Sequence, residues 1–291
     1  MTQTIPGITI KIMIGIVDVG GGMRGAYGAG VLDCFLEKDF KADYCIGVSA
    51  GSANLSSYLA GQKGRNYVFY TDYSFRRNYM SLYNFLHDHN YVDLDYIYSV
   101  LSNQNGEYPL DFEKIIASKI PLEIVATDAL EGKPHYFQLN DMSINQYDAI
   151  KASCAVPIAD EPYFINNIPY YDGGITDPIP FHKAFEYGCD KVIIILTRPK
   201  SFRRNPKKDE LTTKLLSKKY PNASKAMALR ASTYNRQLDE ACKLEEEGKV
   251  IIVSPDSIGH MKTLTKDKNE IRNLYLKGYR DALEKCFHQA V

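Results

Sequence analysis

The chain of 291 residues has no excess of charge, because 35 Lys and Arg residues balance 35 Asp and Glu residues. This balance excludes a global attraction to nucleic acid or to an anionic membrane, so we expect no nucleic-acid partner and leave only local patches open. No C-x-x-C pair occurs, so a zinc site or redox motif of that kind is not expected. The cysteines are scattered through mostly apolar segments, which suits core packing in a reducing, cytoplasmic setting; they are Cys34, Cys45, Cys154, Cys189, Cys242 and Cys286.

The chain also lacks an apolar run of transmembrane length. The apolar stretch from Ile8 to Val19 is interrupted by Lys11 and Asp18, follows no basic residue and has no small-residue cleavage site. We interpret it as a buried first strand.

Short apolar, β-branched segments alternate with segments of helical pattern along most of the chain. This order predicts parallel strands joined by right-handed crossovers. We therefore expect an α/β fold, a three-layer α/β/α sandwich around a mainly parallel central sheet. A single domain would span residues 1–291, with its core at about 12–200 and a further strand and helices after it. Strands are expected at 12–19, 44–48, 122–127, 191–197 and 249–253, helices at 24–38, 50–61, 145–154, 180–187, 210–219, 224–247 and 267–288, and a hairpin at 163–171 around Asn166-Asn167.

Two insertions stand apart from this alternation. Residues 67–98 hold eleven aromatic side chains, which would suit a lid or the wall of an acyl-chain pocket, or would simply pack against the domain. For most of these rings we favour ordinary packing. Residues 198–208 hold six basic side chains, which would attract phosphate head groups or an anionic bilayer, or would form a solvated loop. We favour the loop.

The segment Gly47-Val48-Ser49-Ala50-Gly51 is a G-x-S-x-G sequence between an expected strand and an expected helix. A serine in such a tight turn needs glycines two positions before and after it, because the backbone is strained. The turn lifts the hydroxyl away from the sheet, so Ser49 is a candidate nucleophile.

A second motif, Gly20-Gly21-Gly22-Met23-Arg24-Gly25, follows the first expected strand and offers backbone N–H groups that can receive an oxyanion. The same G-x-G-x-x-G pattern is the dinucleotide fingerprint, with Asp39 or Asp43 as the acid that would bind a ribose. Neither aspartate lies at the end of the second strand, and this alternative leaves Ser49 and its glycines unexplained.

A third motif, Asp172-Gly173-Gly174, follows the hairpin. These three motifs and their spacing, with the runs 126–128 and 152–157, resemble the patatin-like phospholipase family over about residues 12–200. Beyond that range the likeness is limited to a strand followed by helices.

The resemblance implies a Ser–Asp dyad that hydrolyses fatty-acyl esters through an acyl-enzyme, without metal or organic cofactor. Ser49 would attack the ester and Asp172 would accept its proton. Whether burial raises the pKa of Asp172 or hydrogen bonding lowers it is not evident from the sequence. Arg24 would contact a head group or form a structural ion pair. The oxyanion hole would use the amides of Gly20, Gly21, Gly22, Met23 and Ala50.

Three alternatives remain. The same dyad would serve an acyltransferase, and the fold would also serve a non-catalytic lipid-binding or regulatory protein. His260 would complete a triad in the order Ser49, Asp172, His260, as in α/β-hydrolases, although the serine lies early in the chain for that fold. The expected partner is a lipid or acyl-ester substrate, with a cytoplasmic location that allows peripheral contact with a membrane surface. The oligomeric state is not indicated.

Overall fold

A computed structural model describes residues 2–5 and 8–288 of the chain, and in this part eight strands form one mixed sheet. The strand order is β10-β9-β3-β4-β5-β8-β7, and β6 pairs with β5. Strands β10, β9, β3, β4 and β5 are mutually parallel, whereas β6, β7 and β8 are antiparallel additions at the β5 side. The bounds are β3 Ile14–Asp18, β4 Tyr44–Val48, β5 Leu122–Asp128, β6 Lys133–Gln138, β7 Tyr163–Ile165, β8 Ile168–Asp172, β9 Lys191–Ile195 and β10 Val250–Val253.

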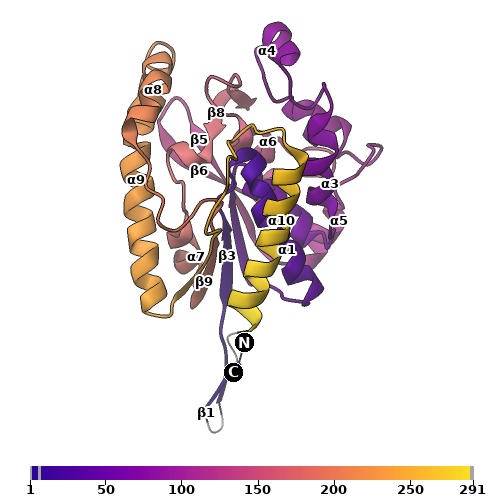
Figure 1. Ribbon diagram of the computed structural model, residues 1–291, viewed down its shortest axis with the longest axis vertical. Coiled ribbons are helices and arrows are strands. Elements are labelled where there is room, and N and C mark those ends of the chain that lie inside the picture. Colours follow the sequence, from indigo (N-terminus) through magenta and orange to yellow (C-terminus); the bar gives the residue numbers. More distant parts are fainter. Residues whose placement is uncertain (1, 6–7, 289–291) are drawn as a thin grey trace.

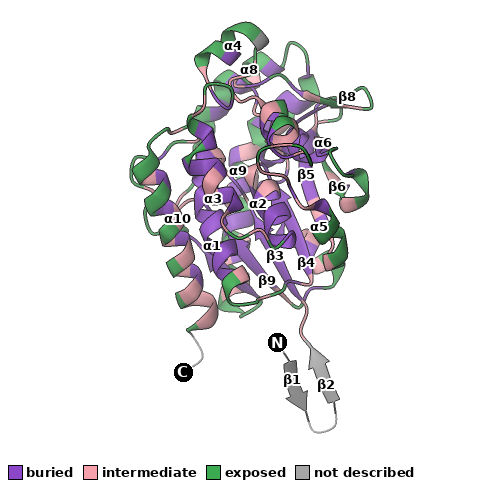
Figure 2. Ribbon diagram, turned by 90° about the vertical axis from the view of Figure 1, so that its right-hand side faces the viewer, coloured by how far each residue is buried: buried purple, intermediate pink, exposed green. Residues whose placement is uncertain are grey.

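Helices cover both faces of this sheet (Figure 1). On one face α1 (Ala26–Glu37) packs along α10 (Lys268–Ala282), and on the other lie α7 (Phe181–Tyr187) and α9 (Pro221–Glu246). Successive strand residues alternate between the two cores: Ile16 joins the α1 side and Val17 the α7 side. Both faces are apolar, so the central strands are buried throughout (Figure 2). The predicted three-layer α/β/α sandwich is confirmed.

Most predicted elements are present close to their expected bounds. Strand β4 coincides with residues 44–48, and the helices expected at 50–61, 145–154 and 210–219 are present as α2 (Ala50–Leu59), α6 (Asp148–Cys154) and α8 (Glu210–Leu216). The hairpin of β7 and β8 turns through Asn166 and Asn167, whose φ angles are 50° and 64°. Positive φ at both turn positions is what a two-residue hairpin loop requires, and asparagine tolerates it.

The first expected strand is wrong in part. The stretch from Ile8 to Val19 is not one strand: β1 (Thr2–Ile5) and β2 (Ile8–Lys11) form a separate antiparallel hairpin, and the sheet strand β3 begins only at Ile14. The break follows Lys11, a residue that already interrupts the apolar run. Two further elements were not expected, α5 (Phe112–Ser118) and β6. Strand β6 is mostly exposed, so it carries no continuous apolar signal.

The aromatic insertion 67–98 folds into short helical pieces beside the carboxyl ends of the strands. They are α3 (Arg65–Thr71), a 3₁₀ turn (Tyr73–Phe75), α4 (Leu82–Asp88) and a π-helical turn (Tyr96–Val100). Figure 1 places α4 at the end of the molecule opposite the two chain termini. None of the helices in the described ranges combines the length and apolar composition needed to cross a bilayer.

Candidate active site

Ser49 lies on a sharp turn between β4 and α2. Its φ and ψ are 55° and −134°, a conformation that L-residues rarely adopt and that costs about 1–3 kcal/mol. The flanking glycines are required by space: a Cβ on Gly47 would lie 2.5 Å from the Cα of Ser52, and one on Gly51 would lie 2.1 Å from the carbonyl oxygen of Asp18. The strand–turn–helix context that G-x-S-x-G predicts is therefore present.

The turn is held by two hydroxyl groups. The amide of Ser49 donates to Ser153 Oγ at 2.8 Å, and Ser153 Oγ in turn donates to the carbonyl oxygen of Val125 at 2.6 Å. Ser52 Oγ donates to the carbonyl oxygen of Ser49 at 2.6 Å. Ser153 thus ties the serine turn to β5.

Strand register explains how Asp172 reaches this turn. The first half of β5 pairs with β4, with Val48 opposite Val125, and its second half pairs with β8, with Asp172 opposite Ala126. Strand β6 occupies the other edge of β5 over the same residues, so β4 and β8 share one edge. Their carboxyl ends therefore meet one residue apart along β5, and this places Asp172 beside Ser49.

Asp172 is buried, and its carboxylate accepts a hydrogen bond from the amide of Gly174 at 2.8 Å. Burial raises the pKa of Asp172 above its ordinary value. The charge of Arg230, a hydrogen bond from the Ser49 hydroxyl, the Gly174 amide and the charge of Arg204 all lower it, but burial has the larger effect. The carboxylate is therefore a stronger base than an exposed aspartate.

The glycine loop lies against the serine turn. Gly20, Gly21 and Gly22 have φ angles of 61°, 122° and 60°, so three successive residues take a conformation that favours glycine. A Cβ on Gly20 would lie 2.9 Å from the amide nitrogen of Ala50, which shows how closely the two segments approach. The Gly20 carbonyl accepts a hydrogen bond from Thr197 Oγ1.

Two of the expected oxyanion donors are already engaged. The amide of Gly20 donates to Asp18 Oδ1 at 2.9 Å, and the amide of Met23 donates to the carbonyl oxygen of Thr263 at 2.8 Å. In the described part of the chain, no hydrogen bond occupies the amides of Gly21, Gly22 or Ala50. The candidate donors thus narrow to these three.

Asp18 stabilises the glycine loop through its hydrogen bond with the amide of Gly20. It is fully buried, accepts from Asn54 Nδ2 at 3.0 Å, and burial raises its pKa to about 6 against the hydrogen bonds from Asn54 and Gly20. In the sequence Asp18 stood out only as an interruption of an apolar run. Its place immediately before the glycine motif is the signal that could have identified it.

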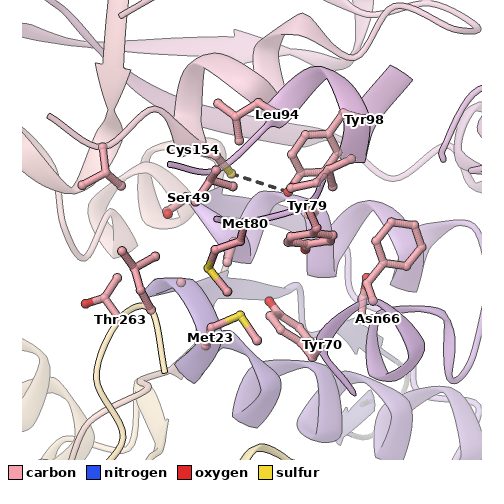
Figure 3. A pocket seen from close by; sticks show the side chains of 18 of the residues that line it. Met23, Ser49, Asn66, Tyr70, Tyr79, Met80, Leu94, Tyr98, Cys154 and Thr263 are labelled. Atoms are coloured by element: carbon pink, nitrogen blue, oxygen red, sulfur yellow. Dashed lines mark hydrogen bonds between the residues drawn. The ribbon is translucent and has the colours of Figure 1, made fainter. Parts of the chain in front are cut away.

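An apolar cavity of about 220 Å³ opens onto Ser49 (Figure 3). Much of its wall comes from the aromatic insertion and its flanks: four of the rings, Phe69, Tyr70, Tyr79 and Tyr98, line the cavity together with Met80, Leu94 and Ile97. Other rings of the insertion pack elsewhere; Tyr67, for example, lies against Tyr275, with the two ring planes tilted by 53°.

Cys154 lies beside Ser49 in the wall of this cavity (Figure 3). Tyr98 Oη is 3.6 Å from its sulfur. Burial raises the pKa of Cys154 to about 12, so the thiol stays protonated and is a poor nucleophile near neutral pH.

A second, polar pocket of about 160 Å³ shares Ser49 with the apolar cavity. It contains most of the predicted site residues together, namely Ser49, Asp172, Gly20, Gly21, Gly22 and Arg24. Arg198, Arg204 and Arg230 complete its wall. Arg230 could not be singled out from the sequence, because it lies within a long polar helix.

The side chains of the basic run 198–208 point in different directions. Arg198 and Arg204 face the polar pocket, whereas Arg203 pairs with Asp239 at 2.6 Å and Lys200 pairs with Glu245 at 2.5 Å on the surface. The solvated-loop interpretation therefore fits only part of the run. Arg24 has no ion-pair partner among the described residues; its Nη1 donates to Thr263 Oγ1 at 3.1 Å.

The alternatives fare differently. His260 is exposed and lines neither pocket. Asp39 and Asp43 precede β4 and so lie at the amino ends of the parallel strands, away from the glycine loop that follows β3. This placement removes the ribose-binding acid that a dinucleotide site needs. Among the residues that the structure describes, no three His, Cys, Asp or Glu side chains gather as a metal site would require.

Comparison with known proteins relates the chain to one family. The model described as patatin-like phospholipase matches residues 19–185, and a domain of unknown function, DUF6363, matches residues 220–290. The uncharacterized protein YjjU of Escherichia coli is 31% identical over 198 residues, which are 66% of this chain and 54% of YjjU. The uncharacterized NTE family proteins Mb1092c of Mycobacterium bovis and Rv1063c of Mycobacterium tuberculosis are each 36% identical over 76 residues, 26% of this chain and 20% of theirs.

The chain thus spans about half the length of the first relative and a fifth of the mycobacterial ones. Among solved structures, VipD from Legionella pneumophila aligns with a TM-score of 0.49 and 14% identity, over 95% of this chain and 67% of VipD. The family model covers more than half of the residues, and its range contains the serine turn, the glycine loop and Asp172. The chain belongs to the patatin-like phospholipase family.

Proposed function

We propose that the protein is a serine lipid acyl hydrolase that cleaves fatty-acyl esters through an acyl-enzyme on Ser49, with Asp172 as its base. The observation that carries this proposal is the position of Ser49, on a strained turn between an apolar cavity and a polar pocket that contains Asp172. The acyl chain would occupy the apolar cavity and the alcohol portion the polar pocket.

The chemistry follows from these positions. Ser49 Oγ attacks the ester carbonyl carbon while its proton passes to Asp172. The carbonyl oxygen becomes an oxyanion, which the amides of Gly21, Gly22 and Ala50 can stabilise because they have no other partner. Collapse of this intermediate expels the alcohol, which takes the proton from Asp172. Water then attacks the acyl-enzyme, gives a proton to Asp172 and releases the fatty acid, and Ser49 regains its proton.

A fluorophosphonate probe tests the nucleophile directly. We expect the folded wild-type protein to be labelled on Ser49, as located by mass spectrometry, and Ser49→Ala to remain unlabelled. Labelling of another residue, or none on the folded wild type, would overturn the proposal and favour a non-catalytic lipid-binding protein. An acyltransferase would label as well; competition between water and added alcohol or lysolipid for the acyl group distinguishes it from a hydrolase.

We also propose peripheral contact with a lipid surface. At the carboxyl end of the sheet, α4 and α8 expose large apolar side chains, with Leu82 70%, Leu86 74% and Leu211 64% exposed. Figure 1 shows both helices at this end of the molecule. Replacing Leu82 and Leu86 together with serine should weaken sedimentation with phospholipid vesicles, whereas Leu276→Ser on α10 should not. Equal binding by the double variant and the wild type would contradict this contact.

A further inference from the structure

The polar pocket beside Ser49 carries an unusual concentration of positive charge. Four guanidinium groups line it, from three separate places in the chain: Arg24 after the glycine loop, Arg198 and Arg204 after β9, and Arg230 on α9. Burial lowers the pKa of Arg24 to about 9 and that of Arg230 to about 10, and neighbouring arginines add to both effects. Arginine side chains are positively charged at neutral pH, so the fold holds four like charges together against mutual repulsion.

Little in the pocket neutralises these charges. Two carboxylates are near, Asp172 and Asp209. The nearest contacts of Asp209 Oδ1 to Arg204 and Arg230 are 3.8 and 3.7 Å, too long for hydrogen bonds. Asp209 Oδ2 is buried and has no hydrogen-bond partner among the described residues.

Arg24 gives an independent sign of a missing ligand. Its side chain is only 6% exposed, and its Nε is buried without a hydrogen-bond partner in the described part of the chain. Arg76, by contrast, donates to Glu107 from both terminal nitrogens, at 2.6 and 2.7 Å, although Arg65 beside the apolar cavity also has a buried Nε without a partner among the described residues. A buried guanidinium donor left unpaired is costly unless a ligand satisfies it.

We propose that this pocket binds the phosphomonoester group of the substrate, so that the enzyme prefers acyl esters whose alcohol portion carries a dianionic phosphate. The four arginines and two carboxylates give the pocket a net charge of +2. A phosphomonoester, with a charge of about −1.5 to −2 at pH 7, nearly balances this charge. Guanidinium groups also match phosphate oxygens in a bidentate geometry. A phosphodiester such as a glycerophosphocholine offers one negative charge and adds a cation that the arginines repel.

The position of Ser49 links this preference to the reaction, and the inference rests on the proposed hydrolysis at that residue. Ser49 lines both the apolar cavity and the arginine pocket. An ester at Ser49 therefore extends its acyl chain one way and its alcohol portion the other. The phosphate must lie within a few bonds of the ester oxygen, as in an acylglycerol phosphate.

Three substrates with one acyl chain test the preference: an acylglycerol 3-phosphate, the neutral acylglycerol and the acylglycerophosphocholine, each below its aggregation concentration. We expect the wild-type kcat/KM to be at least about tenfold higher for the phosphomonoester, mainly through KM. Arg198→Gln should lower this ratio about tenfold, the effect of losing one charge-assisted hydrogen bond. Arg198→Lys should restore part of it. The control Arg203→Gln lies on the same segment but points to the surface and should leave the ratio unchanged.

Several results would overturn the inference. Wild-type enzyme without a preference would do so, as would an equal loss on all three substrates in Arg198→Gln, since the arginine would then act through Asp172 or the fold. The same loss of preference in Arg203→Gln would reduce the effect to surface charge.

Calorimetry on the Ser49→Ala protein distinguishes a phosphorylated substrate from free phosphate as the ligand. It also tests the phosphate pocket separately from the hydrolase proposal. Glycerol 3-phosphate should bind, and binding should be lost when Arg198→Gln is added. If this holds while no ester is hydrolysed, the phosphate pocket stands and the hydrolase proposal fails. Inorganic phosphate that binds while hydrolysis shows no preference would make free phosphate the ligand and overturn the substrate assignment. No binding by either compound would also overturn it.

Discussion

Replacing Ser49 with glycine should abolish ester hydrolysis and yet give a more stable protein than replacing it with alanine. The reason is the backbone of the serine turn, with φ at 55° and ψ at −134°. Any residue with a Cβ is strained in that conformation, and glycine is not. Alanine removes the hydroxyl but keeps the strain, so the pair of variants isolates the backbone contribution.

The expected difference can be estimated. Relief of the strain contributes about 1–3 kcal/mol. Against this, glycine gains more freedom in the unfolded chain and costs about 0.5–1 kcal/mol relative to alanine. The net difference is about 1 kcal/mol in favour of glycine, which corresponds to roughly 2 °C in Tm for a domain of this size.

Urea and thermal unfolding of the two variants measure this difference. The matched control is Ala228→Gly, at an exposed position within α9, where glycine should lower the free energy of unfolding by about 1 kcal/mol. If Ser49→Gly were less stable than Ser49→Ala by a similar amount, the turn would be unstrained. The argument that its geometry serves a nucleophile would then fail.

Four further predictions concern activity. Asp172→Asn should lose nearly all activity. Because burial raises the pKa of Asp172 above 3.8, the kcat/KM of the wild-type enzyme should begin to fall at a pH above that value as the solution is made more acidic. A pH profile that stays flat down to pH 3.8 would contradict this expectation. Gly21→Ala would place a Cβ 2.8 Å from Thr197 Oγ1 in a residue whose φ is 122°. The amide of residue 21 would therefore be displaced, and kcat should fall about 10²–10³-fold. An unchanged kcat would show that this amide is not part of the oxyanion hole. Ala53→Phe should fill part of the apolar cavity and lower the kcat/KM ratio of long over short p-nitrophenyl esters, whereas an unchanged ratio would place the acyl chain elsewhere. His260→Ala should keep kcat/KM within about twofold, and a loss as large as that of Asp172→Asn would support a triad.

Elements with a strong local pattern were predictable from sequence. Strand β4 is buried on both faces and is followed by a glycine-flanked serine, and both its ends were expected where they lie. The hairpin turn at Asn166-Asn167 was evident because two asparagines between apolar runs tolerate positive φ. Strand β6 was missed because an exposed edge strand needs no apolar continuity.

The arginine pocket could not be predicted, because its members are neighbours only in three dimensions. Arg198 and Arg203 lie five residues apart in one basic run, yet one lines the pocket and the other pairs with Asp239. Both residues are arginines in the same basic run, so the composition of the run does not distinguish them. The path of the loop between β9 and α8 determines which way each of these two side chains points. The pocket also includes Arg230 on α9, and no local sequence pattern relates Arg230 to the basic run.

The meeting of Ser49 with Asp172 depends on a property of the sheet rather than of either motif. Strand β5 gives one edge to two partners, first to parallel β4 and then to antiparallel β8, so two strands that run in opposite directions end toward each other. Side chains alternate along a strand, so a shift of β8 by one residue would turn Asp172 to the opposite face of the sheet. The Thr127 hydroxyl donates to the carbonyl oxygen of Asp172 at 2.9 Å and the amide of Asp172 donates to Ala155, and these bonds fix that register from two sides. The distance in sequence between nucleophile and base is therefore of little consequence, because the pairing along β5 determines their separation in space.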